Sequence, residues 1–394
     1  MKKRPQNHVA MHRRQYEEVF ARWLGAGHAF AFWKGRVALY AILEALGVGE
    51  RDEVILPGYT CVMAVNPIVY LGAKPVYVDI EPVTYNIDPA MIERKITAKT
   101  KVIIAQHTYG YPAQMDAIMR IASARGIPVV EDCCPALGSR YRGRFVGTFG
   151  VASFWSSQWN KPYTTGIGGM VTTSDADLAA KIWRIQRGCS IRPGRMEAAI
   201  LGCQLAAYQT LVYPETTAIA QTIFRWLSRT GLAVGSSAPE EFTPIMPEGF
   251  CKGMADVQVC AGLRQLRNID RMIAHRRAMA QVYDRLLGAL DWPVPRIPGA
   301  LDPVLVRYPV RVRDKALALG TAAKNLVEIG SWFECPLHPI ETPMKRYGYE
   351  MGMCPVAERA CAEVINLPVH PRANEATAKH TVSFVANIGP ARSI

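Results

Sequence analysis

Between residues 52 and 132 the sequence alternates between short, continuously apolar runs and longer stretches with helical spacing. Runs such as Val54-Ile-Leu and Val102-Ile-Ile-Ala are typical of strands that are buried on both faces. This alternation predicts an α/β fold with a mainly parallel sheet sandwiched by helices. We expect strands at 53–57, 75–79, 101–106 and 127–132, and helices at 62–71, 89–96 and 115–125.

The ends of the expected strands predict where a ligand would bind. In open α/β sheets, ligands lie beyond the carboxyl ends of the strands. Three loops, 57–61, 106–110 and 132–135, leave strands at those ends. The sequence therefore places these loops around one site.

Length and composition fit a globular protein of two closely associated domains. The chain has 394 residues, of which 49% are hydrophobic and 20% charged. No apolar run reaches about 18 residues, so a transmembrane helix is not expected, and the basic start lacks the apolar stretch of a secretory signal. The ten cysteines show no zinc-like spacing. We therefore expect no metal site, and reduced thiols in a cytoplasmic protein.

The net charge of +13 indicates an anionic partner. A small anionic ligand, an anionic membrane surface and nucleic acid would all fit it. The basic residues are spread along the chain, and no nucleic-acid-binding motif accompanies them. Nucleic acid is therefore the least favoured of the three.

The remaining sequence indicates three parts: a basic, partly helical arm (1–30), a large domain (31–250) and a smaller C-terminal α+β domain (251–394). The small domain should open with a long helical region at 254–287, whose basic residues we interpret as a solvated face. It should continue with a strand at 305–312, a helix near 314–328, a long loop, and a final helix from 374.

An apolar segment, about 190–248, interrupts the large domain as an atypical helical insert. Its stretch 198–229 could form amphipathic helices that lie on a membrane. The alternative, which we favour, is that it packs on the protein itself or on a dimer mate, because no run of lysines faces one side.

The stretch from Ser153 to Met170 holds a single lysine, Lys161, among aromatic, hydroxyl and glycine residues. A lysine shielded by apolar walls loses part of its proton affinity and can attack a carbonyl carbon. Lys161 is therefore a candidate Schiff-base lysine. A surface lysine beside a glycine turn is the alternative, and residues elsewhere in the chain decide between them.

Several ordered motifs together resemble one family. The chain resembles the DegT/DnrJ-type pyridoxal-phosphate (PLP) aminotransferases of keto-sugars, which have the fold-type I architecture of aspartate aminotransferase. The resemblance covers most of the chain outside the first thirty residues and the insert. It is carried by Asp52-Glu-Val-Ile-Leu-Pro, Gly72-Ala-Lys-Pro-Val-Tyr-Val-Asp79, His107-Thr-Tyr-Gly110, Glu131-Asp132 and Lys161 with Gly168-Gly169.

The resemblance implies roles for individual residues. Lys161 would form the Schiff base with PLP and shuttle a proton, and Asp132 would keep the pyridinium nitrogen protonated. Ser156 would bind the cofactor phosphate, together with the backbone amides of the turn at Gly35 and Arg36. Gly168 and Gly169 would allow close packing beside the site.

Other positions are open or depart from the family pattern. His107 is expected near the cofactor, where a direct role and a purely structural hydrogen-bonding role are about equally favoured. Pro135 stands where the family has a Gln or His that contacts the cofactor oxygen, and it cannot donate a hydrogen bond. Cys61 stands where an aromatic ring is usual, so either its thiol packs on the cofactor ring or Tyr59 replaces the aromatic residue.

The leading interpretation is an aminotransferase that moves an amino group from glutamate to a keto-sugar in polysaccharide or natural-product biosynthesis. In view of the net charge, we expect the keto-sugar to be nucleotide-linked. The resemblance also implies a homodimer. Two alternatives stay open: a PLP enzyme acting on a non-sugar ketone such as a cyclitol, and a degenerate PLP-fold partner or regulatory protein. Lys161 argues against the dehydratases related to this family, which carry His at that position.

Overall fold

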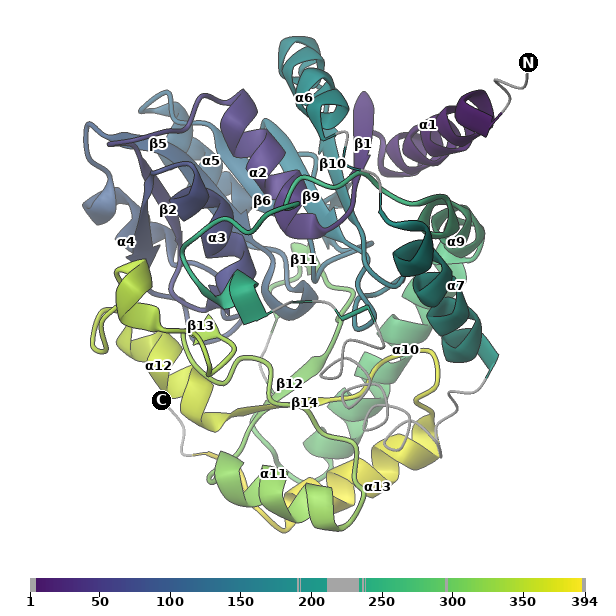
Figure 1. Ribbon diagram of the computed structural model, residues 1–394. Coiled ribbons are helices and arrows are strands. Elements are labelled where there is room, and N and C mark those ends of the chain that lie inside the picture. The colour runs from purple at the N-terminus through teal and green to yellow at the C-terminus, as the bar shows by residue number, and fades with distance from the viewer. Residues whose placement is uncertain are drawn as a thin grey trace.

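The computed structural model of the chain describes residues 5–189, 191, 193–210, 234–235, 237, 239–294 and 297–391. A seven-stranded sheet forms its centre (Figure 1). The strands, in order across the sheet, are β1 (His28–Phe32), β10 (Gly169–Thr173), β9 (Ala152–Ser156), β6 (Val129–Asp132), β5 (Thr100–Gln106), β2 (Glu53–Pro57) and β4 (Lys74–Val78).

Most neighbouring strands of this sheet run parallel. The pairs β4–β2, β2–β5, β5–β6 and β6–β9 are parallel, whereas β10 runs antiparallel to both β9 and β1. The four strands expected between residues 53 and 132 are all present. The prediction of a mainly parallel, mixed sheet is confirmed.

Helices cover both faces of the sheet, as predicted. On one face, α2 (Gly35–Ala45) packs against α3 (Val62–Tyr70), α6 (Ala176–Gly188) and strands β9 and β10. On the other face lie α4 (Pro89–Lys95) and α5 (Met115–Ser123), which bury Ile92 and Ile118 against the sheet. Because strand side chains alternate between faces, each residue at a strand end belongs to one of these two sides.

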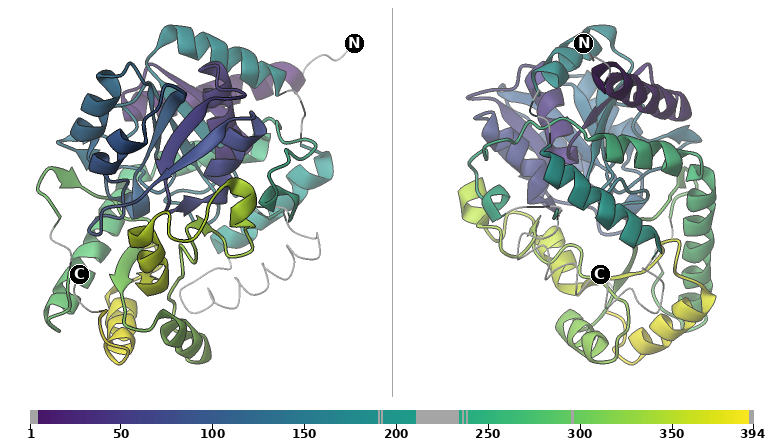
Figure 2. Two further views of the ribbon diagram at one scale, coloured as in Figure 1. Left: turned by 90° about the vertical axis from the view of Figure 1, so that its left-hand side faces the viewer. Right: turned by 45° about the vertical axis from the view of Figure 1, so that its right-hand side comes forward.

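The first described helix is anchored in the body of the protein. Helix α1 (Pro5–Leu24) packs along β1 and α9 (Asp256–Leu266), as Figures 1 and 2 show. Tyr16 and Phe20 on α1 are fully buried. The hydroxyl groups of Tyr16 and Tyr163 are 2.8 Å apart and hydrogen-bonded. Helix α1 thus braces the loop that carries Lys161.

The C-terminal part contains the expected strand, which belongs to a small antiparallel pair, and the expected final helix. The pair is β12 (Tyr308–Arg311) with β14 (Val364–Leu367). The helices of this part are α10 (Ile269–Gly288), α11 (Lys315–Lys324), α12 (Pro355–Glu363) and α13 (Glu375–Ala386), and they lie in the lower half of Figure 1. Sequence reasoning did not foresee α12 and β14. Strand β14 follows α12 without a turn residue that would mark the boundary.

Short elements complete the described structure. They are the strands β3 (Thr60–Cys61), β7 (Arg140–Tyr141), β8 (Arg144–Phe145), β11 (Leu301–Asp302) and β13 (Leu337–His338), and the 3-10 helices η1 (Thr108–Gly110), η3 (Pro239–Phe242) and η4 (Met344–Tyr347). Strand β13 pairs in parallel with β3. This pairing brings the C-terminal part against the edge of the site.

The helical region expected at 254–287 is two helices, because α9 ends before Arg267 and α10 begins after Asn268. The interpretation of its basic residues as a solvated face is wrong for Arg276. That side chain is buried, and its Nη1 donates to the carbonyl oxygens of Leu305 and Val306, both at 3.1 Å. Arg276 therefore fastens α10 to the segment that enters β12.

The described part of the apolar insert packs on the protein itself. Helix α7 (Arg195–Thr210) buries Leu201 and Leu205 in a cluster with Trp33 and Ile167. The rest of the stretch expected at 198–229, from residue 211 onward, lies outside the described residues. Among the helices that are described, none combines the length and apolar character needed to cross a membrane. The boundaries of the arm and the two domains stay a prediction.

Candidate active site

The predicted site residues Asp132, Ser156 and Gly35 come together on the α2 face of the sheet. Asp132 ends β6, Ser156 ends β9, and Gly35 begins α2. A Cβ atom added to Gly35 would lie 3.1 Å from Ser156 Cβ and 3.2 Å from the Trp155 carbonyl oxygen. Glycine thus lets the first turn of α2 approach Ser156. Ser156 is buried, with 7% of its surface exposed.

Gly169 and Gly168 are required by equally close contacts. A Cβ atom on Gly169 would lie 2.4 Å from the Lys34 carbonyl oxygen, and one on Gly168 would lie 2.3 Å from Ser157 Oγ. The predicted close packing beside the site is confirmed. Because the amide groups in the first turn of a helix have no partner inside the helix, this packing leaves the start of α2 suited to bind an anion.

Asp132 is a buried carboxyl group, with 6% of its surface exposed. The Cys134 amide N–H donates to Asp132 Oδ1 at 3.0 Å. Burial raises the pKa of Asp132, while the Cys134 N–H and the positive charge of Lys161 act in the opposite direction. Asp132 forms no salt bridge within the described part of the chain. A cationic ligand group beside it would supply the missing partner.

Lys161 lies in the loop between β9 and β10, with its side chain half-buried. Its Nζ is 4.2 Å from the centre of the Trp332 ring, a cation–π contact. The charge of Lys161 also shifts the pKa values of Asp132, Cys61 and His338. Lys161 therefore faces the site beside these groups, and the interpretation as a surface lysine is not supported.

Arg36 is buried at the start of α2 and pairs with an acidic residue near the C-terminal end of the insert. Its Nη1 lies 2.7 Å from Glu241 Oε1, and its Nη2 donates to Ser237 Oγ at 3.2 Å. Lys34 Nζ lies 2.9 Å from the other Glu241 oxygen. Burial, and next the charge of Arg36, lower the pKa of Lys34. Two cations thus share one carboxylate here, and the sequence pattern gave no signal for Glu241.

His107 is fully buried, and both of its ring nitrogens are engaged. Nδ1 accepts from the Ala113 N–H at 3.0 Å, and Nε2 lies 3.1 Å from Glu131 Oε2. Glu131 and Asp132 are consecutive in β6, so their side chains point to opposite faces. The His107 ring therefore lies on the side away from Asp132. The geometry favours the structural role that the sequence left open.

The cluster of His107, Glu131 and Cys133 has the composition of a metal site, but the carboxylate is already saturated. Besides His107, the Glu131 oxygens accept three backbone N–H bonds of 2.6 to 2.7 Å, from Gly147, Phe149 and Gly150. We assign this cluster to the framework that fixes β6.

Cys61 lies at the site, where it ends β3 and precedes α3. Burial raises the pKa of its thiol, and Arg36 and Lys161 oppose that shift. Tyr59 lies in the core: its hydroxyl is hydrogen-bonded to the Tyr109 hydroxyl at 2.7 Å, and its ring packs on Phe333 at 4.5 Å. Tyr59 therefore does not take the place of the missing aromatic residue.

Trp332 and His338 belong to the site, and sequence reasoning missed both. They come from a segment that was expected only as a long loop. His338 is the register partner of Cys61 in the β13–β3 pair. Burial lowers the pKa of His338 to about 4, with further contributions from Lys315 and Lys161. The aromatic content of this loop was the one local signal in the sequence for a role of these two residues.

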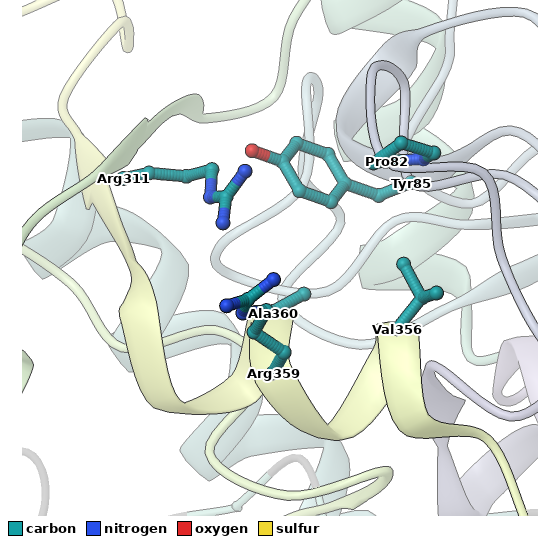
Figure 3. Close-up of a pocket in the computed structure, with 6 residues that line it drawn as sticks. All are labelled: Pro82, Tyr85, Arg311, Val356, Arg359 and Ala360. Atoms are coloured by element: carbon teal, nitrogen blue, oxygen red, sulfur yellow. The ribbon is translucent and has the colours of Figure 1, made fainter. Parts of the chain in front are cut away.

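A small pocket lies elsewhere, between the turn at Tyr85 and the elements β12 and α12. It is lined by Pro82, Tyr85, Arg311, Val356, Arg359 and Ala360 (Figure 3). Its volume of about 10 Å³ is roughly that of one water molecule. Both arginines are ion-paired with Glu363. None of the predicted site residues lines this pocket, so we do not assign the reaction to it.

Comparison with known proteins identifies the family. A sequence model of the DegT/DnrJ/EryC1/StrS aminotransferase family matches residues 7–206 and 215–386. The chain belongs to this aminotransferase family. Its similarity to GDP-perosamine synthase of Caulobacter vibrioides is 31% identity over 377 residues, which covers 95% of this chain and 89% of that protein.

Two further proteins bear on the fold and activity of this family member. L-glutamine:2-deoxy-scyllo-inosose aminotransferase of Micromonospora echinospora is 32% identical over 305 residues, which is 77% of this chain and 64% of that protein. The solved aminotransferase from Psychrobacter cryohalolentis superposes with a TM-score of 0.75 at 27% identity, covering 96% and 92% of the two chains. The protein is therefore a fold-type I aminotransferase, and the cofactor of its family is PLP.

Proposed function

We propose that this aminotransferase transfers an amino group from glutamate to the ketone of a nucleotide-linked keto-sugar. The similarity to a GDP-perosamine synthase along nearly the whole chain supports a sugar acceptor. The net charge of +13 supports an acceptor with a diphosphate group. The placement of Lys161 beside the buried carboxyl of Asp132 carries the proposal, because an aminotransferase needs both an amine and an acidic partner for its cofactor.

The residues at the site fit PLP at both ends. Asp132, which has no salt bridge in the described chain, offers a carboxylate to a pyridinium nitrogen. Ser156 and the first amide groups of α2, at Gly35 and Arg36, offer donors to a phosphate. Because Gly35 has no Cβ atom, the start of α2 comes close to Ser156. The two together form a narrow site of the kind a phosphate group requires. When bound, PLP supplies the electron sink for carbanion chemistry.

Each residue then has a distinct task. Lys161 would hold PLP through Nζ and would carry the proton that leaves the substrate carbon. Asp132 would keep a proton on the ring nitrogen. Cys61 would contribute its thiol to the wall of the cofactor site. His107 acts through the strand, since its backbone N–H donates to the Asp132 carbonyl oxygen at 3.1 Å. We propose that His107 positions Asp132 and does not touch the cofactor.

Two residues of the C-terminal part, Trp332 and His338, lie near the amine of Lys161. The Trp332 ring covers Nζ on one side. His338, with its pKa lowered to about 4, is neutral near pH 7 and adds no competing positive charge. The C-terminal segment that carries Trp332 and His338 thus completes a site whose other groups come from the sheet.

Replacement of Lys161 tests the assignment directly. Lys161→Ala should remove the visible absorbance of the protein–PLP adduct and abolish transamination. Lys181→Ala, on the exposed side of α6, is the matched control and should keep both. Asp132→Asn should retain the adduct but lose most of the turnover. A Lys161→Ala protein that stays coloured and active would overturn the proposal.

The acceptor class can be resolved with the aminated form of the enzyme. A cyclitol ketone is the second candidate, favoured by the similarity to an inosose aminotransferase over 77% of this chain. The pyridoxamine-loaded protein is mixed with a nucleotide-linked 4-keto-sugar or with scyllo-inosose, and recovery of the PLP absorbance is followed. Faster recovery with the sugar supports our proposal, and recovery only with the cyclitol contradicts it. Glutamate and glutamine are compared as donors in the other half-reaction, in which the donor converts the PLP form into the pyridoxamine form.

We also propose that the enzyme is a cytoplasmic homodimer. All ten cysteines are free thiols, which suits a reducing compartment, and the family resemblance implies active sites completed across a two-fold axis. Light scattering on the purified protein should give twice the chain mass of 43.6 kDa. A monomer that is fully active would contradict the dimer.

A further inference from the structure

The apolar insert leaves and rejoins the large domain at two cysteines. Cys189 follows the last residue of α6, and Cys251 follows Phe250 where the chain returns before α9. The two chain segments are held side by side by a bridge between Ile191 and Lys252. In addition, the Gly253 N–H donates to the Ile191 carbonyl oxygen at 3.0 Å. The base of the insert is therefore a fixed junction of two adjacent strands of chain.

The two cysteines lie next to these paired segments, and their side chains pack in the same cluster. They are close enough for each thiol to shift the pKa of the other. Cys189 is buried, with 7% of its surface exposed, whereas Cys251 is partly accessible to solvent. The interaction with Cys189 lowers the pKa of the Cys251 thiol, and the interaction with Cys251, followed by burial, raises the pKa of Cys189. Cys251 is thus the more nucleophilic and the more reachable member of the pair.

The two cysteines lie on a rigid support. Phe250, next to Cys251, packs edge-on against Tyr40 of α2, with ring centres 5.5 Å apart, and also against Tyr70 of α3. Cys189 belongs to the same buried cluster. Because both backbones are held by these contacts, a disulfide bond would join two segments that already lie side by side.

We propose that Cys189 and Cys251 form a reversible disulfide that closes the insert at its base. Nothing in the transamination reaction uses this pair, so the site is separate from the active site. It resembles the pairs that sense redox state in reducing compartments, where an exposed thiol attacks first and a buried neighbour resolves the intermediate.

The oxidation is a balanced thiol–disulfide exchange with a small disulfide such as oxidised glutathione. The Cys251 thiolate attacks one sulfur of that disulfide, and the first glutathione thiolate leaves. The Cys189 thiol then loses its proton and attacks the Cys251 sulfur of the mixed disulfide, which expels the second glutathione. The protein loses two protons and two electrons, and one oxidised glutathione becomes two reduced molecules.

A disulfide between Cys189 and Cys251 would act on the segment that contacts the start of α2. Residues 190–250 include Glu241, whose carboxylate pairs with Lys34 and Arg36 at the start of α2. A disulfide restricts the unfolded freedom of the loop that it closes. The oxidised enzyme should therefore have a larger free energy of unfolding than the reduced enzyme.

The test uses the full-length, PLP-loaded protein and oxidised glutathione as the probe. After oxidation, free thiols are alkylated, the chain is digested without reduction, and peptides are identified by mass spectrometry. We expect a linked peptide containing Cys189 and Cys251 in a band that migrates as a single chain, reversed by dithiothreitol. Cys203→Ser, at an exposed cysteine of α7, is the control and should form the same link.

The single variants separate the order of steps. Cys189→Ser should accumulate glutathione on Cys251, because the resolving thiol is missing, whereas the wild type should carry little. Cys251→Ser should leave Cys189 unmodified. Equal glutathione on Cys251 in the wild type and in Cys189→Ser, or the absence of the 189–251 peptide at every glutathione potential tested, would overturn the proposal.

Discussion

His338 should make the folded protein less stable in mild acid. Its pKa is lowered from the ordinary value of 6.5 to about 4, first by burial and then by Lys315 and Lys161. Between these two values the unfolded chain binds a proton on His338 that the folded chain does not. The contribution of neutral His338 to the free energy of unfolding is therefore fully present above about pH 6.5. It is lost as the pH falls toward about 4.

The size of the effect follows from the two pKa values. Between about pH 7.5 and about pH 5, a single histidine with this shift lowers the free energy of unfolding by about 2 kcal/mol. His338→Asn removes the titration but keeps a side-chain acceptor for the Glu334 N–H, which lies 3.4 Å from His338 Nδ1. The free energy of unfolding of the variant should therefore fall by about 2 kcal/mol less across this range.

The assay is urea unfolding of the wild type and of His338→Asn at both pH values. Other buried groups also titrate in this range, but they are common to both proteins, so the difference of differences isolates His338. His380→Asn, at an exposed position of α13, is the control and should follow the wild type. Identical pH dependence in the wild type and in His338→Asn would refute the reasoning.

Two further predictions concern the start of α2. Gly169→Ala should weaken PLP binding measured by absorbance titration, because its Cβ would lie 2.4 Å from the Lys34 carbonyl oxygen; Gly49→Ala, which meets no atom within 4 Å, should bind PLP normally. Glu241→Ala should lower the free energy of unfolding by about 3–5 kcal/mol, since it leaves Lys34 and Arg36 buried without their shared carboxylate. Denaturant unfolding of Glu241→Ala and Glu240→Ala, its exposed neighbour, gives the comparison, and equal losses in both would contradict the role of the buried pair.

The sequence was most informative where local pattern and fold agree. Apolar runs separated by amphipathic stretches predicted the strands and helices between residues 53 and 132, because buried parallel strands need side chains of one kind along their length. The motifs at Asp132, Ser156 and Lys161 sit at strand ends or in the adjoining loop, where topology leaves little freedom. The pattern was silent for α12 and β14, which join without a turn residue.

The sequence by itself determined the sheet, the family resemblance and the groups that the sheet carries to one edge. Only the tertiary structure decided which side chains face the site. His107 and Asp132 both stand at strand ends, yet the alternation of side chains along β6 ties the His107 ring to Glu131 on the other face.

Trp332, His338 and Glu241 reach the site from segments more than 70 residues beyond Lys161. A contact of this range depends on how the C-terminal part folds back, as when β13 pairs with β3, and no local spacing encodes it. The lysine that organises the site can therefore be recognised in the sequence, whereas the groups that shield it and balance its surroundings are set by packing.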